Sequence, residues 1–244
     1  MSTANVDKPV GQLVRERPAA ARVFERLGID YCCQGKRTLA EACQQGGLDL
    51  DAVDSALEGE ESVPAEFDWL QLNLNELADH IVATHHTWLR SELPRLTELF
   101  EKVIRAHGER HAEVVQAAAI YARLREELAA HMGKEEQVLF PILHRLARGE
   151  RGAVLCGSLA RPIHVMEHEH SEVGQALAEL RHLTAGFAPP ADACTTFCVL
   201  YAGLAALEQD LHLHIHKENN VLFPRAQALE RRARERVAAQ EIRR

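Results

Sequence analysis

The chain has 244 residues, of which 46% are hydrophobic, and a formal net charge of −8. This length fits one medium-sized domain with a small additional module, and the apolar fraction is sufficient for a buried core. The acidic excess argues against a nucleic-acid partner. We expect no membrane span, because no run of 18 apolar residues occurs, and no secretion, because the N-terminus has no apolar segment. The expected location is therefore the cytoplasm.

Histidine is the unusual residue in this composition, with fourteen in the chain, and metal chemistry is the first hypothesis that this number raises. The cysteines show no spacing typical of a disulfide-stabilised secreted module, so we expect thiols. They are Cys32, Cys33, Cys43, Cys156, Cys194 and Cys198.

Residues 1–58 are predicted to form a small helical module. A helix is expected over residues 18–27, where Gly28 would end it. A turn that contains two adjacent cysteines follows. Further helices are expected to begin at Thr38 and near Leu50.

The rest of the chain is predicted to be an all-α four-helix bundle. After a charged linker at residues 59–67, apolar residues recur at helical spacing and strand signals are nearly absent. Short breaks predict an up-down-up-down bundle over residues 68–235, followed by a charged tail at 236–244. Asp192 is the expected N-cap of the last helix. The four helices are expected at residues 68–105, 111–147, 158–184 and 193–232.

An eleven-residue phrase occurs twice in the bundle, 83 residues apart. HMGKEEQVLFP begins at His131 and HIHKENNVLFP begins at His214, and the copies are identical at seven positions. In each copy a histidine precedes a glutamate by four residues, which places both on one helix face. Two such helices facing each other would offer Glu135 and Glu218 to a shared site, as in carboxylate-bridged dimetal centres.

The core positions of the four helices decide which histidines point inward. Each predicted core row is apolar except for one histidine, or one histidine and one glutamate; the second row continues to Val138 and Ile142. The alternative is a set of buried histidines satisfied by the glutamates, at a desolvation cost on the order of several kcal/mol per uncompensated charge. We therefore favour metal coordination. The candidate ligands are His86, His131, Glu135, His170, His214 and Glu218.

The same helix phase excludes other histidines from this site. The two that flank His214 at a distance of two residues lie about 200° around the helix and are predicted to face outward. A pair four residues apart on the third helix lies in a polar row and is expected to face solvent. The histidine at the end of the first helix lies 21 residues beyond His86, about 31 Å along a continuous helix. The excluded residues are His85, His107, His164, His168, His212 and His216.

Four imidazoles and two carboxylates fit two metal ions, each with two imidazoles and one oxygen from each bridging glutamate. Nitrogen and oxygen ligands without thiolate suit iron or manganese, and a carboxylate bridge favours a di-iron pair. Zinc accepts the same donors but prefers tetrahedral geometry. A solvent-derived bridge would still leave open positions where O₂, NO or water could bind.

The phrases DYCCQGKRTL, HMGKEEQVLFP, PIHVMEHEH, ACTTF and HKENNVLFPR resemble those of the bacterial repair-of-iron-centres proteins. The resemblance covers nearly the whole chain. It implies a hemerythrin-like di-iron bundle with a short N-terminal double-cysteine domain. It also implies an oxo-bridged and carboxylate-bridged pair of non-haem irons in a cytoplasmic, often dimeric stress protein.

Carried over residue by residue, the family's ligands are the same six residues that the core rows indicate, with Glu135 and Glu218 as the bridges. Oxygen-carrying hemerythrins instead use five histidines, and here Met166 stands four residues before His170. The loop over residues 148–158 is longer than expected for the family and brings in Cys156, to which no role is assigned. Members of the family often have another histidine three residues after the first ligand, and this position is Leu89 here.

Cys32 and Cys33 are candidates for a redox or iron-transfer site. Lys36 and Arg37 follow closely and should lower the pKa of a nearby thiol, and a disulfide between adjacent cysteines is strained and easily reduced. The alternative is two half-buried thiols in a small helical core; the resemblance favours the functional interpretation. We expect core packing for the second cysteine pair, Cys194 and Cys198.

The resulting hypothesis is repair of iron–sulfur clusters damaged by nitrosative or oxidative stress. The partners would be damaged iron–sulfur proteins, with NO or O₂ as small ligands. Two alternatives share the same site: a hemerythrin-like NO or O₂ sensor, and an oxidoreductase that reduces NO. The sequence does not separate repair from NO reduction.

Overall fold

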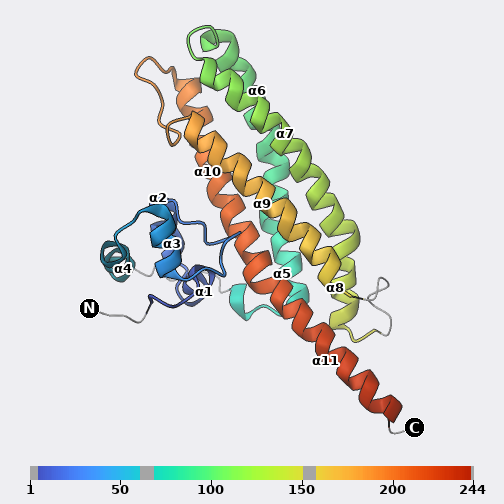
Figure 1. Ribbon diagram of the computed structural model, residues 1–244. Helices are drawn as coiled ribbons and strands as arrows, with labels where there is room; N and C mark the ends of the chain where they lie inside the picture. The colour runs from blue at the N-terminus through green and yellow to red at the C-terminus, as the bar shows by residue number, and fades with distance from the viewer. Residues whose placement is uncertain (1–4, 61–68, 151–157, 243–244) are drawn as a thin grey trace. The chain divides into compact units, whose positions relative to one another are not determined.

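The structure is a computed structural model that describes residues 5–60, 69–150 and 158–242 (Figure 1). Helices make up the regular structure of these residues, apart from one isolated bridge between Pro9 and Thr38. The predicted all-α four-helix bundle with a small N-terminal helical region is confirmed. None of the described helices combines the length and apolarity needed to cross a membrane.

Contacts divide the chain into two compact units. One unit combines residues 1–77 with residues 212–244, and the other is formed by residues 78–211. The predicted domain boundaries stay predictions, and Cys156 and most of the proposed linker lie outside the described residues.

The first unit begins with four short helices whose ends follow from local sequence. Gly28 ends α2 in the left-handed region at φ 68°, as its lack of a side chain allows. Thr38 caps α3 with a reciprocal pair of hydrogen bonds to Glu41, and Asp49 caps α4. These starts confirm the prediction, whereas α1 was not predicted. The helices are α1 (Val10–Glu16), α2 (Ala20–Leu27), α3 (Leu39–Gly46) and α4 (Leu50–Gly59).

The second unit contains the four-helix bundle, formed by α6, α7 with α8, α9 and the first part of α10 (Figure 1). Gly203 on α10 allows a close approach to α6, since a Cβ there would lie 2.7 Å from Leu96. The remaining elements in chain order are η1 (Trp69–Gln71), α5 (Leu74–Ile81), η2 (Val82–His86), α6 (Thr87–His107), α7 (Ala112–Lys134), η3 (Glu135–Leu139), α8 (Phe140–Ala147), α9 (Ala160–Leu183), α10 (Thr195–Lys217), η4 (Glu218–Leu222) and α11 (Phe223–Ile242).

In the described part of the chain, three five-residue π turns interrupt the long helices, and each contains a predicted ligand: η2, η3 and η4. Each copy of the repeated phrase places its π turn directly before Phe-Pro. Proline has no N–H and its ring collides with a carbonyl of the preceding turn in a regular α-helix, so a wider turn relieves the conflict. No proline follows η2, and that turn has no such explanation.

The π turn also shifts the phase of the second core row, so its predicted continuation is wrong. Val138 is 56% exposed and Ile142 is half-buried, while Leu139 and Leu143 are buried instead. A π turn contains more residues per turn than an α-helix. Every later side chain is therefore rotated relative to the position that a 3.6-residue period predicts.

Two further expectations near the start of α10 are wrong. Asp192 is not the N-cap, because α10 begins at Thr195 and the aspartate instead lies 3.0 Å from His111. Cys194 and Cys198 are exposed rather than packed in the core. Phe197 and Leu200 form the buried face at this end of α10, and the two cysteines, which share a face because they are four residues apart, lie off it.

Candidate metal centre

Four of the six predicted ligands lie together within residues 78–211. His86 ends η2, His131 lies on the last turn of α7, Glu135 begins η3, and His170 lies on α9. All four side chains are buried, with Glu135 and His86 at 0% exposure. The bundle therefore brings three imidazoles and one carboxylate into one apolar interior.

Glu135 lies between two of these imidazoles. One carboxylate oxygen is 3.3 Å from His86 Nε2 and the other is 3.4 Å from His131 Nε2. Neither oxygen accepts a hydrogen bond from any part of the chain that the structure describes. A buried carboxylate in this condition is costly unless a cation compensates it.

His131 and His170 face each other, with their Nε2 atoms 3.0 Å apart. On a six-coordinate metal with bonds of about 2.1 Å, two neighbouring ligand atoms are about 3.0 Å apart. The separation of the two nitrogens therefore fits a shared metal ion, which removes the conflict between two lone pairs.

Two outer carboxylates hold the rings in the orientation that a metal requires. His86 Nδ1 is 2.7 Å from Glu136, and His131 Nδ1 is 2.7 Å from Glu169. Although burial opposes it, hydrogen bonds from His86 and Arg90 lower the pKa of Glu136. The pKa of Glu169 is lowered against burial in the same way, with Lys134 and His131 as donors. Charged carboxylates accept the Nδ1 protons, which leaves each Nε2 lone pair directed inward.

The sequence reasoning missed both outer carboxylates. Each stands beside a predicted ligand in the chain: Glu136 follows Glu135, and Glu169 precedes His170. Adjacency in a helix separates two side chains by about 100°, so the core row excluded them. The signal available in the sequence was a charged residue directly beside a buried imidazole or carboxylate.

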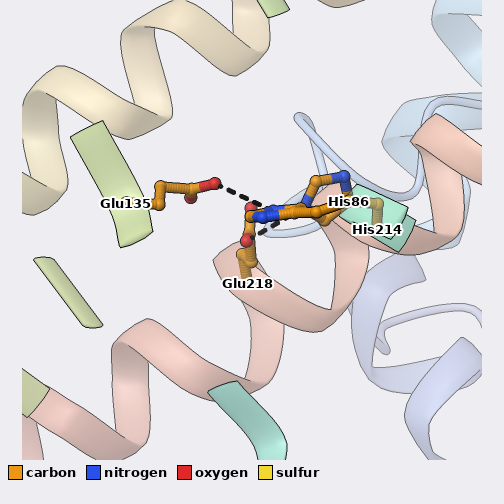
Figure 2. A group of neighbouring side chains, drawn as sticks. All are labelled: His86, Glu135, His214 and Glu218. Atoms are coloured by element: carbon orange, nitrogen blue, oxygen red, sulfur yellow. Dashed lines mark hydrogen bonds and ion pairs between the residues drawn. The ribbon is translucent and has the colours of Figure 1, made fainter. Parts of the chain in front are cut away.

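The other two predicted ligands, His214 and Glu218, stand one turn apart where α10 passes into η4. His214 Nε2 lies 3.1 Å from a Glu218 oxygen, and both side chains are buried. Figure 2 shows this pair with His86 and Glu135, and the ligand atoms of these four side chains all lie within 4.8 Å of one another. The same limit holds for a second group, His131, Glu135, His170 and Glu218.

These two groups share both glutamates and differ only in their imidazoles. Two carboxylates with two imidazoles per group are the donors of a carboxylate-bridged dimetal centre in a helical bundle. The orphaned oxygens of Glu135 and the facing imidazoles are both satisfied by cations. The residues present therefore fit a metal.

Among the excluded histidines, His216 was wrongly expected to face outward. It is fully buried, edge-on to Tyr31 at 5.5 Å and to Trp69 at 6.1 Å between ring centroids. Burial lowers the pKa of His216 to about 4, which keeps the ring neutral. The helix phase identified only one buried face of α10, whereas residues of the N-terminal module bury a second one.

Two other histidine assignments have clear outcomes. His164 and His168 are exposed, as predicted. His85 is buried, with its Nδ1 2.7 Å from Asp210. It belongs to neither of the two four-residue groups.

The adjacent cysteines sit in a turn organised by Asp30. One oxygen of this carboxylate accepts hydrogen bonds from the backbone N–H groups of Cys32, Cys33 and Gln34, at 2.8–3.3 Å. The two sulfur atoms are 3.7 Å apart and are not joined. The hydrogen bond with Cys33, together with burial and the Asp30 charge, raises the pKa of Cys32. The expected lowering by the nearby basic residues is therefore wrong for this thiol.

This cysteine turn contacts the residues that follow Glu218. Asn219 and Asn220 donate side-chain hydrogen bonds to the Cys32 carbonyl, at 3.3 and 3.1 Å. Gly35 is required for the approach, because a Cβ there would collide with the Asn220 side chain and would lie 2.6 Å from the Tyr31 carbonyl oxygen. The sequence carried a signal for this contact: the repeated phrases differ at the two asparagines, which replace Glu136 and Gln137 of the first copy.

Comparison with known proteins matches two family models to the chain. Residues 77–226 match the hemerythrin HHE cation binding domain, and residues 6–61 match ScdA_N, a domain of unknown function (DUF542). The iron–sulfur cluster repair protein YtfE of Enterobacter sp. (strain 638) is 42% identical over 223 residues, 91% of this chain and 97% of the relative. YtfE proteins of Escherichia coli O1:K1 and Escherichia fergusonii are each 40% identical over 222 residues, with the same coverage.

This chain belongs to the family of iron–sulfur cluster repair proteins. The resemblance inferred from the quoted motifs is confirmed. The cation-binding model spans all six predicted ligands, and the N-terminal model spans Cys32 and Cys33. The chain accordingly contains a hemerythrin-like cation-binding domain.

Proposed function

We propose that this protein holds two non-haem iron ions and repairs iron–sulfur clusters damaged by nitrosative or oxidative stress. The observation that supports it most is Glu135, a fully buried carboxylate between two imidazoles with both oxygens lacking a hydrogen-bond donor in the described chain. The curated relatives are named as repair proteins and match over nearly their full length. Cytoplasmic location and action on damaged iron–sulfur proteins belong to this proposal.

In this proposal Glu135 and Glu218 would be held in common by the two ions, because both occur in each of the two ligand groups. His86 with His214 would complete one ion, and His131 with His170 the other. An iron pair supplies open coordination positions for NO or O₂ and a store of iron for transfer. Glu136 and Glu169 keep the protons of His86 and His131 on Nδ1, so that the Nε2 atoms remain available.

We further propose that Cys32 and Cys33 act as a redox or transfer site. Two contacts support this role: the sulfur atoms lie close together, and the Cys32 carbonyl is bound by the two asparagines that directly follow Glu218. The hydrogen bond with Cys33, burial and the Asp30 charge raise the pKa of Cys32, which keeps this thiol protonated. It is therefore suited to thiol exchange only after a partner removes its proton, because a protonated thiol is not itself a nucleophile.

The test is a repair assay with the full-length protein. Iron-loaded protein is added to a cluster-dependent dehydratase inactivated with NO, and both recovered activity and iron content are measured. We expect two irons per chain and recovery that is lost in Cys32→Ser/Cys33→Ser, whereas His164→Gln/His168→Gln behaves as wild type. Protein that holds one zinc and no iron would refute the di-iron proposal. Steady NO consumption without cluster recovery would instead establish an NO reductase, and NO binding alone would indicate a sensor.

A further inference from the structure

We propose a second metal site, separate from the centre above: a mononuclear divalent cation held by His107, His111 and Asp192. His107 ends α6, His111 directly precedes α7, and Asp192 lies just before α10. All three belong to the unit of residues 78–211. The ligand atoms of the three side chains lie within 4.8 Å of one another.

Chain geometry keeps this cluster apart from the proposed iron centre. The helix α6 runs without interruption from Thr87 to His107. At 1.5 Å per residue, the 21 residues from His86 to His107 span about 31 Å. No residue is common to the two clusters, so a cation here would be bound independently.

The backbone turn places the two imidazoles on the same side. The N–H groups of Arg110 and His111 both donate to the His107 carbonyl at 2.9 Å. Phe197 packs edge-on against both rings, with centroids 5.4 Å away in each case. His107 is itself buried, at 7% exposure. These contacts restrict both rings before any ligand arrives.

The distances suit a small divalent ion. His111 Nε2 lies 3.0 Å from Asp192, and neighbouring ligand atoms on a metal with bonds of about 2.1 Å are about 3.0 to 3.4 Å apart, depending on geometry. The ligand atoms of the three side chains lie within 4.8 Å of one another. A small side-chain movement would therefore bring all of them to the separations that a metal ion requires.

His111 also has the outer partner typical of a metal-bound histidine. Its Nδ1 is 2.8 Å from Glu113 while its Nε2 faces Asp192. A carboxylate on one ring nitrogen fixes the ring and directs the other nitrogen toward a metal. Glu136 stands in the same relation to His86 in the proposed iron centre.

Arg110 is the competitor for this site. Its guanidinium lies 3.5 Å from Asp192 and 3.4 Å from His107 Nδ1. The arginine side chain is 63% exposed, and an exposed ion pair of this kind contributes little to stability because solvent screens it. The guanidinium can therefore turn into solvent when a cation arrives. Two imidazoles and one carboxylate suit Zn²⁺ or Fe²⁺ and leave positions open to water.

The test uses full-length protein already loaded with iron, so that the proposed iron centre is filled. Zn²⁺ is titrated calorimetrically into wild type, into His111→Gln/Asp192→Asn and into the control His164→Gln/His168→Gln. The control removes an exposed histidine pair, His164 and His168, that has the same four-residue spacing as His107 and His111. Iron content is measured before and after titration, to show that zinc has not displaced iron.

We expect one additional zinc equivalent in wild type and in the control, with affinity at least tenfold weaker in the double variant. Asp192→Asn alone changes an exposed side chain, so it separates loss of a ligand from loss of folding and should show the same direction. Equal zinc binding by all four proteins, or no additional equivalent in wild type, would overturn the site. In that case the cluster is an ion pair formed by a protonated histidine.

Discussion

Replacing Glu135 by glutamine should change stability in opposite directions with and without metal. The substitution keeps the shape of the side chain and removes its charge. In the metal-free protein it replaces a fully buried carboxylate without a hydrogen-bond donor by an amide whose NH₂ can donate to an imidazole nitrogen, 3.3–3.4 Å away in the structure. The metal-free variant should therefore be at least as stable as wild type.

With iron bound, the same substitution removes a bridging ligand. Loss of an outer partner of a metal ligand lowers affinity by about 10–100-fold, and a direct ligand should cost at least the upper value. A factor of 100 corresponds to about 2.7 kcal/mol. At about 2–4 °C per kcal/mol for a domain of this size, the iron-induced rise in Tm should shrink by about 5–10 °C.

Circular dichroism melts with and without Fe²⁺, combined with iron analysis, measure both effects. Glu172→Gln is the matched control, because this glutamate on α9 is exposed. An iron-induced rise in Tm equal to that of wild type, with unchanged iron content, would refute the assignment of Glu135 as a ligand.

Three further predictions follow from particular contacts. Glu136→Gln should lower metal affinity by about 10–100-fold in a chelator competition, because it removes the charged acceptor of an imidazole proton; unchanged affinity would contradict that role. His216→Ala should keep full iron content but lower the free energy of unfolding, measured by urea denaturation, by about 2 kcal/mol or more. The substitution leaves a cavity beside the buried rings of Tyr31 and Trp69. Loss of iron would instead show that this imidazole binds metal. Gly35→Ala should destabilise by about 1–3 kcal/mol, because the new Cβ would collide with the backbone carbonyl oxygen of Tyr31 as well as with the Asn220 side chain. Gly133→Ala has open space around its Cβ and should stabilise by up to about 1 kcal/mol. Equal effects of the two substitutions would exclude a collision.

The helices and the inward-facing ligands could be predicted because they depend on local periodicity. A 3.6-residue period and a recurring apolar row place His86, His131, His170 and His214 on buried faces without knowledge of their neighbours. Gly28 and Thr38 mark helix ends for reasons contained within a few residues. Duplication of a histidine and a glutamate in one apolar frame was by itself an indication of a dimetal site.

Two of the wrong predictions depended on where a helix begins or on its staying regular. The π turn η3 rotated Val138 out of the core, because one widened turn changes the phase of everything after it. The helix α10 begins at Thr195, after Asp192, and the carboxylate of Asp192 lies 3.0 Å from His111 instead of capping the helix. Neither shift leaves a mark in the periodicity itself.

The sequence by itself determined which side chains each helix offers to its interior, since that depends on spacing along one helix. Only the tertiary structure decided what those side chains meet: the carboxylates Glu136 and Glu169 on the imidazoles, and the aromatic rings that bury His216. It also brought Asp192 to the turn that contains His107 and His111. Contacts of this kind join residues far apart in the chain, and local propensity carries no information about them.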